Sequence, residues 1–182
     1  MSEVEDNTRY FFNFSFFKID PKWRWMADLA KEESARELQN ILDNLPIKTR
    51  TYSTVGLRDD VDFLIWFMSE SLEDIQEAIS KIFLTVVGKY IVPARVYLSS
   101  TRPSIYAKKN RTHSFVGGLE AKKYTVVYPF IKTREWYLLP LEQRKLMMDE
   151  HIKVSENYPQ VELNTTYSFG IHDQDFMLAF ES

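Results

Sequence analysis

Residues 124–151 read YTVVYPFIKTREWYLLPLEQRKLMMDEH, and this stretch decides the fold of the C-terminal part of the chain. Its first residues are β-branched and aromatic, which is typical of a strand, here over residues 123–131. A helix is predicted over residues 140–156, because Pro140 suits a first helical turn and Glu142 is placed favourably against the helix dipole. The stretch therefore predicts a strand followed by a helix.

One face of this helix combines soft apolar side chains with an imidazole. Residues at i, i+3, i+4 and i+7 share that face, namely Arg144, Met147, Met148 and His151. An imidazole on an apolar face can ligate iron. A core or surface histidine without a metal has the same spacing, so the spacing alone leaves both interpretations open.

The composition excludes several classes of function. With 182 residues, 45% apolar and 15% aromatic, the chain is globular and long enough for one large domain or two small ones. A net charge of −3 gives no basic surface for nucleic acid, and the absence of cysteine excludes disulfides, thiolate catalysis and iron–sulfur clusters. The N-terminus has no signal-peptide pattern and no window is long and apolar enough for a membrane span, so we expect a cytoplasmic protein without a membrane partner.

The order of the predicted elements is that of a ferredoxin-like fold. Strands are predicted over residues 10–19, 47–55, 61–67 and 90–98, and helices over 23–42 and 72–86, which is the order β-α-β-β-α-β. The order begins again with the strand and helix of residues 123–156, followed by strands over 161–169 and 175–180. We therefore predict an α+β chain of two fused ferredoxin-like halves, 1–98 and 123–182, joined by a polar loop at 99–122.

A short internal repeat also indicates two halves. The letters GLRDDVDF of residues 56–63 recur as GIHDQDF at residues 170–176, one residue shorter in the turn. After this hairpin the first half continues with a helix and a strand, whereas the sequence stops at Ser182. We expect the C-terminal half to lack the last helix and strand of its pattern.

Five short motifs follow one another in about the last third of the chain: Tyr128-Pro129-x-x-Lys132, Trp136-Tyr137-x-Leu139, Arg144-x-x-Met147-Met148-x-x-His151, Ser168-Phe169-Gly170-x-x-Asp173-x-x-Phe176 and Phe180-Glu181. Together they resemble the chlorite dismutase-like family, and in particular its coproheme decarboxylases. The resemblance implies a dimeric α/β-barrel type of fold with paired antiparallel sheets, a haem or coproheme held by the C-terminal half, and assembly as a homopentamer.

The resemblance also implies roles for individual residues. His151 matches the proximal ligand of the haem iron, and Tyr128 matches a radical-forming tyrosine near a porphyrin propionate, whose chemistry Lys132 assists. Residues four apart on a strand share a face, so Tyr128 and Lys132 are expected on the same side. Trp136 and Met147 are expected to contact the cofactor. An ordinary core tryptophan, exposed tyrosine and solvated lysine remain the alternatives.

Three further positions bear on the substrate. Arg102 lies in a Ser-x-x-Arg-Pro-Ser-x-Tyr pattern and would pair with a propionate, although a loop arginine can equally be solvated. The distal position falls at Leu163 or Asn164, where chlorite dismutases have an arginine. His113 is a possible distal residue, with an exposed loop histidine as the alternative.

The resemblance therefore implies a haem-dependent oxidoreductase that uses hydrogen peroxide to decarboxylate coproheme propionates. A haem peroxidase or chlorite dismutase is the alternative activity. A non-catalytic haem-binding oligomer is the third hypothesis.

Overall fold

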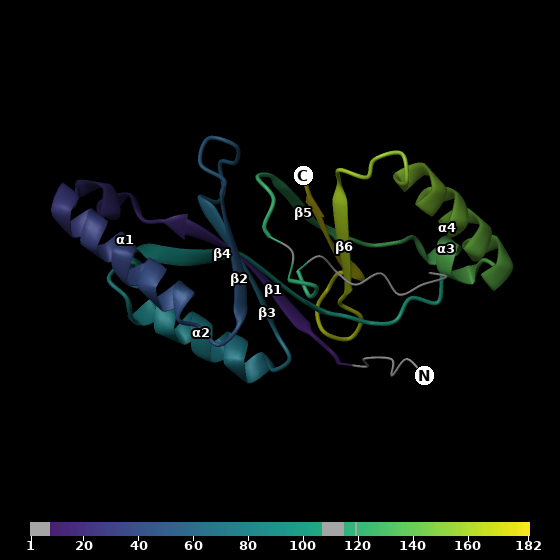
Figure 1. The fold of residues 1–182 in the computed structure, drawn as a ribbon, viewed down its shortest axis with the longest axis horizontal. Coiled ribbons are helices and arrows are strands. Elements are labelled where there is room, and N and C mark those ends of the chain that lie inside the picture. Colours follow the sequence, from purple (N-terminus) through teal and green to yellow (C-terminus); the bar gives the residue numbers. More distant parts are fainter. Residues whose placement is uncertain (1–7, 107–114, 119) are drawn as a thin grey trace. The chain divides into compact units, whose positions relative to one another are not determined.

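The computed structural model describes residues 8–106, 115–118 and 120–182, and the chain divides into two compact units, Met1–Leu98 and Ser99–Ser182 (Figure 1). The first unit contains, in chain order, β1 (Phe11–Ile19), η1 (Pro21–Trp25), α1 (Asp28–Asp43), β2 (Lys48–Ser53), β3 (Phe63–Ser69), α2 (Leu72–Leu84), η2 (Val87–Tyr90) and most of β4 (Ile91–Ser100). Its strands lie in the order β2-β3-β1-β4, and β3 runs antiparallel to both β1 and β2. This is the ferredoxin-like arrangement that the element order predicts.

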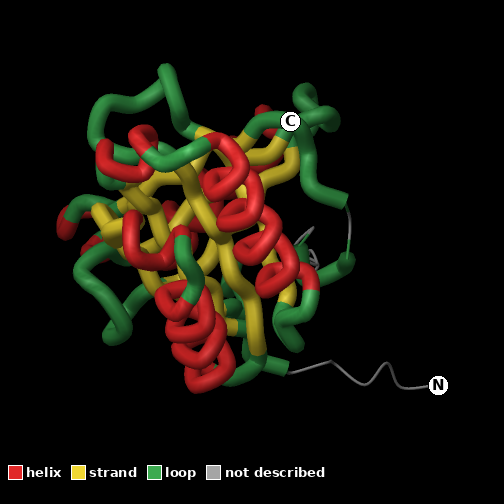
Figure 2. The backbone as a smooth tube through the Cα atoms, turned by 90° about the vertical axis from the view of Figure 1, so that its left-hand side faces the viewer, coloured by secondary structure: helices red, strands yellow, loops and turns green. Residues whose placement is uncertain are grey.

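The helices of the first unit cover one face of its sheet, as the tube view shows (Figure 2). A buried cluster fills the space between them, with Phe17, Ile65 and Phe67 from the strands and Ile75 and Ile82 from α2. Ile65 and Phe67 lie two residues apart, so they share the face of β3 that enters this cluster. The residues between and beside them are buried as well, so both faces of β3 are buried.

The prediction of a single helix over residues 23–42 is wrong at its start. Residues Pro21–Trp25 form the short 3₁₀ helix η1. The Asp20 carboxylate caps its N-terminus by accepting a hydrogen bond from Lys22 N at 2.8 Å. The backbone is then extended at Met26 and Ala27, with ψ of 151° and 143°. A new helix, α1, therefore begins at Asp28.

The second unit repeats the beginning of this arrangement. It contains β5 (Thr125–Phe130), α3 (Arg134–Leu138), α4 (Leu141–Ser155), β6 (Glu162–Tyr167) and β7 (Phe176–Glu181). Its strands lie in the order β6-β7-β5, with β7 antiparallel to both neighbours, and the end of β4 pairs with β6 through Ser100 and Tyr167. The central position of the third strand in both units confirms the α+β fold with ferredoxin-like halves.

The repeat extends to individual hydrogen bonds. In the first unit the Asp62 carboxylate accepts from the backbone N–H of Ile19 at 2.7 Å, and in the second unit the Asp175 carboxylate accepts from that of Lys132 at 3.1 Å. The strand registers make these positions equivalent, because Ile19 and Lys132 each lie two residues after a phenylalanine paired with the first residue of the third strand. Each carboxylate thus ties the end of the first strand to the start of the third.

The two units differ in how their long helix is packed. Leu38, the eleventh residue of α1, packs against the buried cluster together with Ile41 and Leu42. The eleventh residue of α4 is His151, and none of the fifteen residues of α4 is buried. Among the described residues, no helix is both long and apolar enough to cross a lipid bilayer.

Candidate functional site

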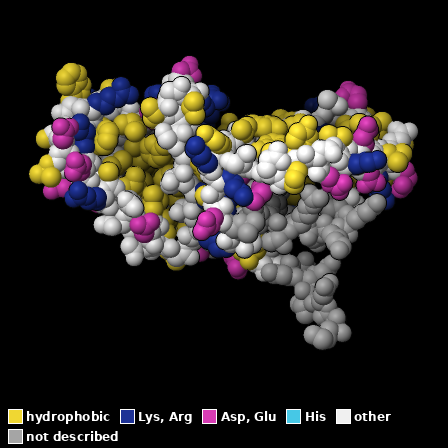
Figure 3. All heavy atoms as spheres, turned by 45° about the horizontal axis from the view of Figure 1, so that its top comes forward, with side chains coloured by type: hydrophobic (Ala, Val, Ile, Leu, Met, Phe, Trp, Pro, Cys, Tyr) yellow, Lys and Arg dark blue, Asp and Glu magenta, His cyan; other side chains and the backbone are white. Residues whose placement is uncertain are grey.

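One face of the second unit's sheet is apolar and partly open to solvent. The register places three rows of side chains across it: Val126, Phe180 and Leu163; then Tyr128, Leu178 and Thr165; then Phe130, Phe176 and Tyr167. Val126 is 58% exposed, and Tyr128 and Leu163 are each 39% exposed. Hydrophobic side chains accordingly run along the surface of this unit on the right of Figure 3.

The register also separates the two residues predicted for the distal position. Leu163 lies on the same face as Tyr128, whereas Asn164 points to the opposite face, where it is buried and donates a hydrogen bond to Glu181 at 3.2 Å. Only Leu163 can therefore contact a ligand on the Tyr128 face.

Lys132 lies just beyond the end of β5, in a cage of aromatic rings. Its Nζ is 3.3 Å from the ring centroid of Trp136, 5.5 Å from that of Tyr106 and 5.6 Å from that of Phe176. The Nζ also approaches the Met148 sulfur on α4 at 3.6 Å. Since Phe176 belongs to the Tyr128 face, the ammonium lies at the end of that apolar surface.

The surroundings of Lys132 disfavour its charge. Burial is the largest cause and the nearby Arg144 guanidinium the second, and together they lower the pKa of Lys132 to about 8, against an opposing contribution from the Asp175 carboxylate. Cation–π contact with the indole offsets part of the lost hydration. An ammonium with this pKa remains mostly charged at neutral pH and binds an anion readily.

Arg144 brings a second cation to the same indole. Its Cζ is 5.4 Å from the Trp136 ring centroid, and Nη1 donates to the Tyr106 hydroxyl at 3.1 Å. Its Nε is buried and has no hydrogen-bond partner among the described residues. Two cations with unused donors at one edge of an apolar surface favour a ligand that carries carboxylates.

Asp175 connects three segments at this site. One oxygen of its carboxylate accepts from Lys132 N and from the Tyr137 hydroxyl of α3, the latter at 2.7 Å. Burial and then the bond to Asp175 raise the pKa of Tyr137, so this phenol stays protonated as a donor.

Tyr106, Arg144 and Asp175 were not predicted as site residues. The sequence does contain signals for them, since Tyr106 ends the Arg-Pro-Ser motif and Asp175 belongs to the repeated hairpin. Their contacts, of Arg144 with Tyr106 and of Asp175 with Tyr137 and the Lys132 backbone, join residues far apart in the chain, which no local pattern predicts.

The predicted ligand face of α4 divides into two parts. Arg144 and Met148 turn inward, towards Trp136 and Lys132. Met147 is 49% exposed, and His151 is exposed with no hydrogen-bond partner among the described residues. An imidazole with both nitrogens unused, beside a methionine and on a helix that buries no residue, fits a ligand to the iron of a bound porphyrin.

Two other predicted residues do not join this group. Arg102 is exposed and forms no ion pair or hydrogen bond within the described part of the chain. His113 lies outside the described residues.

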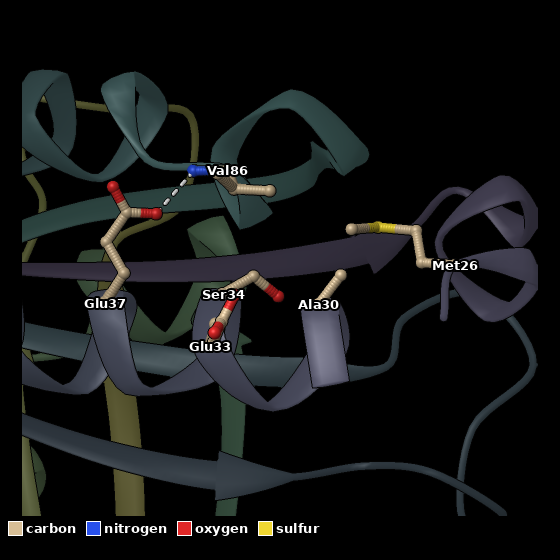
Figure 4. Close-up of a pocket in the computed structure, with 6 residues that line it drawn as sticks. All are labelled: Met26, Ala30, Glu33, Ser34, Glu37 and Val86. Atoms are coloured by element: carbon tan, nitrogen blue, oxygen red, sulfur yellow. Dashed lines mark hydrogen bonds between the residues drawn. The ribbon is translucent and has the colours of Figure 1, made fainter. Parts of the chain in front are cut away.

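The hollows of the first unit are separate from these residues. One, of about 290 Å³, is lined by Met26, Ala30, Glu33, Ser34, Glu37 and Val86, and Glu37 closes one side by accepting from Val86 N at 2.7 Å (Figure 4). Another, open to solvent, follows the turn of residues 56–59. No predicted site residue lines either hollow, and the first offers acidic and apolar groups with no cation.

Comparison with known proteins agrees with these observations. The chain is 33% identical to the coproheme decarboxylase of Mycolicibacterium smegmatis over 97% of its own length and 77% of that protein. A solved chlorite dismutase from Candidatus Nitrospira defluvii, in complex with imidazole, superposes with a TM-score of 0.82 at 23% identity, over 95% of this chain and 76% of that one. The family model described as chlorite dismutase matches residues 31–182. The chain belongs to the chlorite dismutase family.

Proposed function

We propose that the protein binds iron coproporphyrin and decarboxylates its propionate side chains at the expense of hydrogen peroxide. One observation carries the proposal: the apolar sheet face with Tyr128 and the helix α4 with His151 belong to one unit, and both leave apolar side chains uncovered. A flat apolar ligand with carboxylates at its edge satisfies these surfaces and the cations Lys132 and Arg144 together.

In this proposal each group of residues holds one part of the ligand. His151 ligates the iron through an unused imidazole nitrogen, while Tyr128, Leu163 and Met147 contact the porphyrin plane and Trp136 its edge. Lys132 and Arg144 pair with a propionate carboxylate. Arg102, with an unpaired guanidinium in the loop before Tyr106, is a further candidate for a second propionate.

The chemistry assigned to the chain centres on Tyr128. Hydrogen peroxide is the oxidant, and the bound iron porphyrin would activate it. The Tyr128 phenol loses an electron and a proton, and the resulting radical abstracts a hydrogen atom from the propionate side chain. Loss of a second electron and of carbon dioxide leaves a vinyl group, so each propionate carboxylate, peroxide and proton yield one vinyl group, one carbon dioxide and two water molecules. Lys132 holds the departing carboxylate.

The finer parts of the proposal rest on the resemblance and on the relative's activity. We propose a homopentamer in the cytoplasm, in keeping with the family. The 33% identity to a coproheme decarboxylase favours decarboxylation over chlorite dismutation as the activity.

Substitution of Tyr128 by phenylalanine tests the proposal. It removes the oxidisable hydroxyl and keeps the ring that stacks on Phe180 at 6.0 Å, so packing should barely change. We expect unchanged affinity for iron coproporphyrin and no decarboxylated product after peroxide addition, measured by absorption titration and mass spectrometry.

Tyr167→Phe is the matched control, since Tyr167 lies on the same sheet face in the neighbouring row, on β6, two strands away from Tyr128. It should convert the substrate as the wild type does. Wild-type conversion by Tyr128→Phe, or propionates left intact by the wild type, would refute the decarboxylase assignment and favour a peroxidase or a non-catalytic haem binder.

A further inference from the structure

We propose that Asp175 is the positioning residue for Lys132, which it holds in place through the backbone and keeps charged through its carboxylate. The proposal deepens the function proposed above and rests on the role of Lys132 in binding a carboxylate. Asp175 itself need not touch the ligand.

The backbone contacts carry the first half of this proposal. Lys132 follows the last residue of β5 by two positions and precedes Thr133, whose side chain caps α3 by accepting from Trp136 N at 3.3 Å. The bond from Lys132 N to Asp175 at 3.1 Å fixes the chain at this junction. The lysine side chain therefore leaves from an anchored backbone and lies against Trp136.

The charges around Lys132 carry the second half. Among the described residues, its charged and titratable neighbours are the Arg144 guanidinium from α4, the Tyr106 phenol from the preceding loop and the Asp175 carboxylate from the hairpin. The Asp175 carboxylate also accepts from the Tyr137 hydroxyl of α3. Burial and Arg144 favour the neutral amine, and Asp175 favours the ammonium. A neutral amine cannot form an ion pair with a propionate, so the carboxylate of Asp175 preserves the function of Lys132 at neutral pH.

The first unit supplies a comparison within the same molecule. Asp62 makes the equivalent bond to the backbone of Ile19, an apolar residue, and lies 3.5 Å from the Nζ of the preceding Lys18. The backbone bond is therefore a structural feature of both halves. The effect on a caged lysine is confined to the second.

The experiment compares Asp175→Asn with Asp62→Asn in the full chain without porphyrin. Asparagine keeps an oxygen that can accept from the backbone N–H but removes the charge. Lysine side chains are followed by ¹³C NMR through a pH titration, with the Lys132 signal assigned by its loss in Lys132→Met. We expect the pKa of Lys132 to fall below its wild-type value of about 8 in Asp175→Asn and to stay unchanged in Asp62→Asn.

The ligand measurement uses iron coproporphyrin itself. Its affinity for Asp175→Asn should weaken several-fold relative to wild type near pH 8 and recover near pH 6, where the amine is protonated again. Asp175→Glu, which retains the charge, should restore wild-type titration and provides a second variant if asparagine prevents folding.

An unchanged Lys132 titration in Asp175→Asn, or an equal shift in Asp62→Asn, would overturn the proposal. Failure of the proposed function has a different signature. In that case Lys132 still titrates as described in the porphyrin-free protein, while wild type leaves the propionates intact.

Discussion

Lys132 is a charged residue in surroundings that favour its neutral form, so it should reduce the stability of the fold. Its pKa is lowered from 10.5 in the unfolded chain to about 8 in the folded protein. Between these two values the unfolded chain binds more protons than the folded one, and the free energy of unfolding therefore rises with pH. Below about pH 8 the destabilising effect is complete.

Lys132→Met should consequently be more stable than wild type near pH 7. The gain should shrink as the pH rises from about 8 to about 10.5, where the unfolded lysine also loses its proton. Urea unfolding of both proteins without porphyrin across this range measures the difference. A pH-independent difference between them would show that the cage does not disfavour the ammonium.

His151→Ala should abolish iron coordination and leave the fold intact. The residue is exposed on a helix, where alanine is tolerated well, so the free energy of unfolding should change by less than about 0.5 kcal/mol. The absorption spectrum of added ferric coproporphyrin reports the loss of the ligand.

His172→Ala is the control for this prediction, because His172 is bonded to Gln174 at 2.8 Å, in the hairpin that precedes β7. Its spectrum should match that of wild type. An unaltered Soret band in His151→Ala would show that another residue ligates the iron.

The sequence indicates individual residues of the candidate site but not their surroundings. Tyr128, Lys132 and His151 stand in motifs, but β5 ends at Phe130, so the strand period from which the side of Lys132 was predicted does not extend to it. The contacts of Lys132 with Tyr106, Phe176 and Met148 depend on tertiary packing, which brings a loop, a strand and a helix together. The exposure of His151 was likewise not predictable, since the i, i+3, i+4, i+7 spacing of the α4 face is the same whether that face is packed against the core or exposed.

At the scale of elements, capping and periodicity predicted the start of α2 and, within one residue, that of α4, but not that of α1. The break before α1 arises because Asp20 and Pro21 begin a separate 3₁₀ helix, η1. The apolar residues continue at helical spacing across this break, so periodicity alone predicts one uninterrupted helix. The short helix α3 was not predicted either. Its cap, Thr133, lies within a stretch that has no clear period.

The turn between α2 and β4 depends on Gly88. A Cβ atom at this position would lie 2.3 Å from the Ile82 carbonyl oxygen and 2.7 Å from backbone atoms of Phe83. Neither neighbour can move without disturbing the end of α2. We expect Gly88→Ala to lower the free energy of unfolding by about 3 kcal/mol or more, as measured by urea unfolding.

Gly56→Ala provides the comparison, because Gly56 has a φ of +77° but open space around it. Only the left-handed backbone is then penalised, at about 1 kcal/mol. Equal losses in the two variants would mean that the turn after α2 adapts to the added methyl group.

At the scale of the whole molecule, the fold was predictable from sequence because the order of strands and helices is that of a ferredoxin-like fold and the hairpin is repeated. The pairing of β7 between β5 and β6 follows from the first half by analogy. The packing of α4 could not be predicted in the same way, because at the equivalent position α1 packs the partly buried Leu38 against the core, whereas α4 exposes His151.

The absence of an arginine at Leu163 predicts which reaction the protein does not perform well. Leu163 lies on the Tyr128 face and offers no charge to an anionic oxychlorine substrate. With iron porphyrin bound, the protein should release little oxygen from chlorite, as followed with an oxygen electrode. Rapid release at neutral pH would reverse the ranking of the two activities.

The uncovered helix α4 also bears on how long the protein survives without its ligand. A helix that buries no residue opens easily, and proteases cleave segments that open. Limited trypsin digestion should therefore cut α4, at Lys145 or Lys153, before it cuts α1, and iron coproporphyrin should slow the cuts in α4 more than those in α1. In a cell, the amount of this protein would then rise and fall with its porphyrin supply.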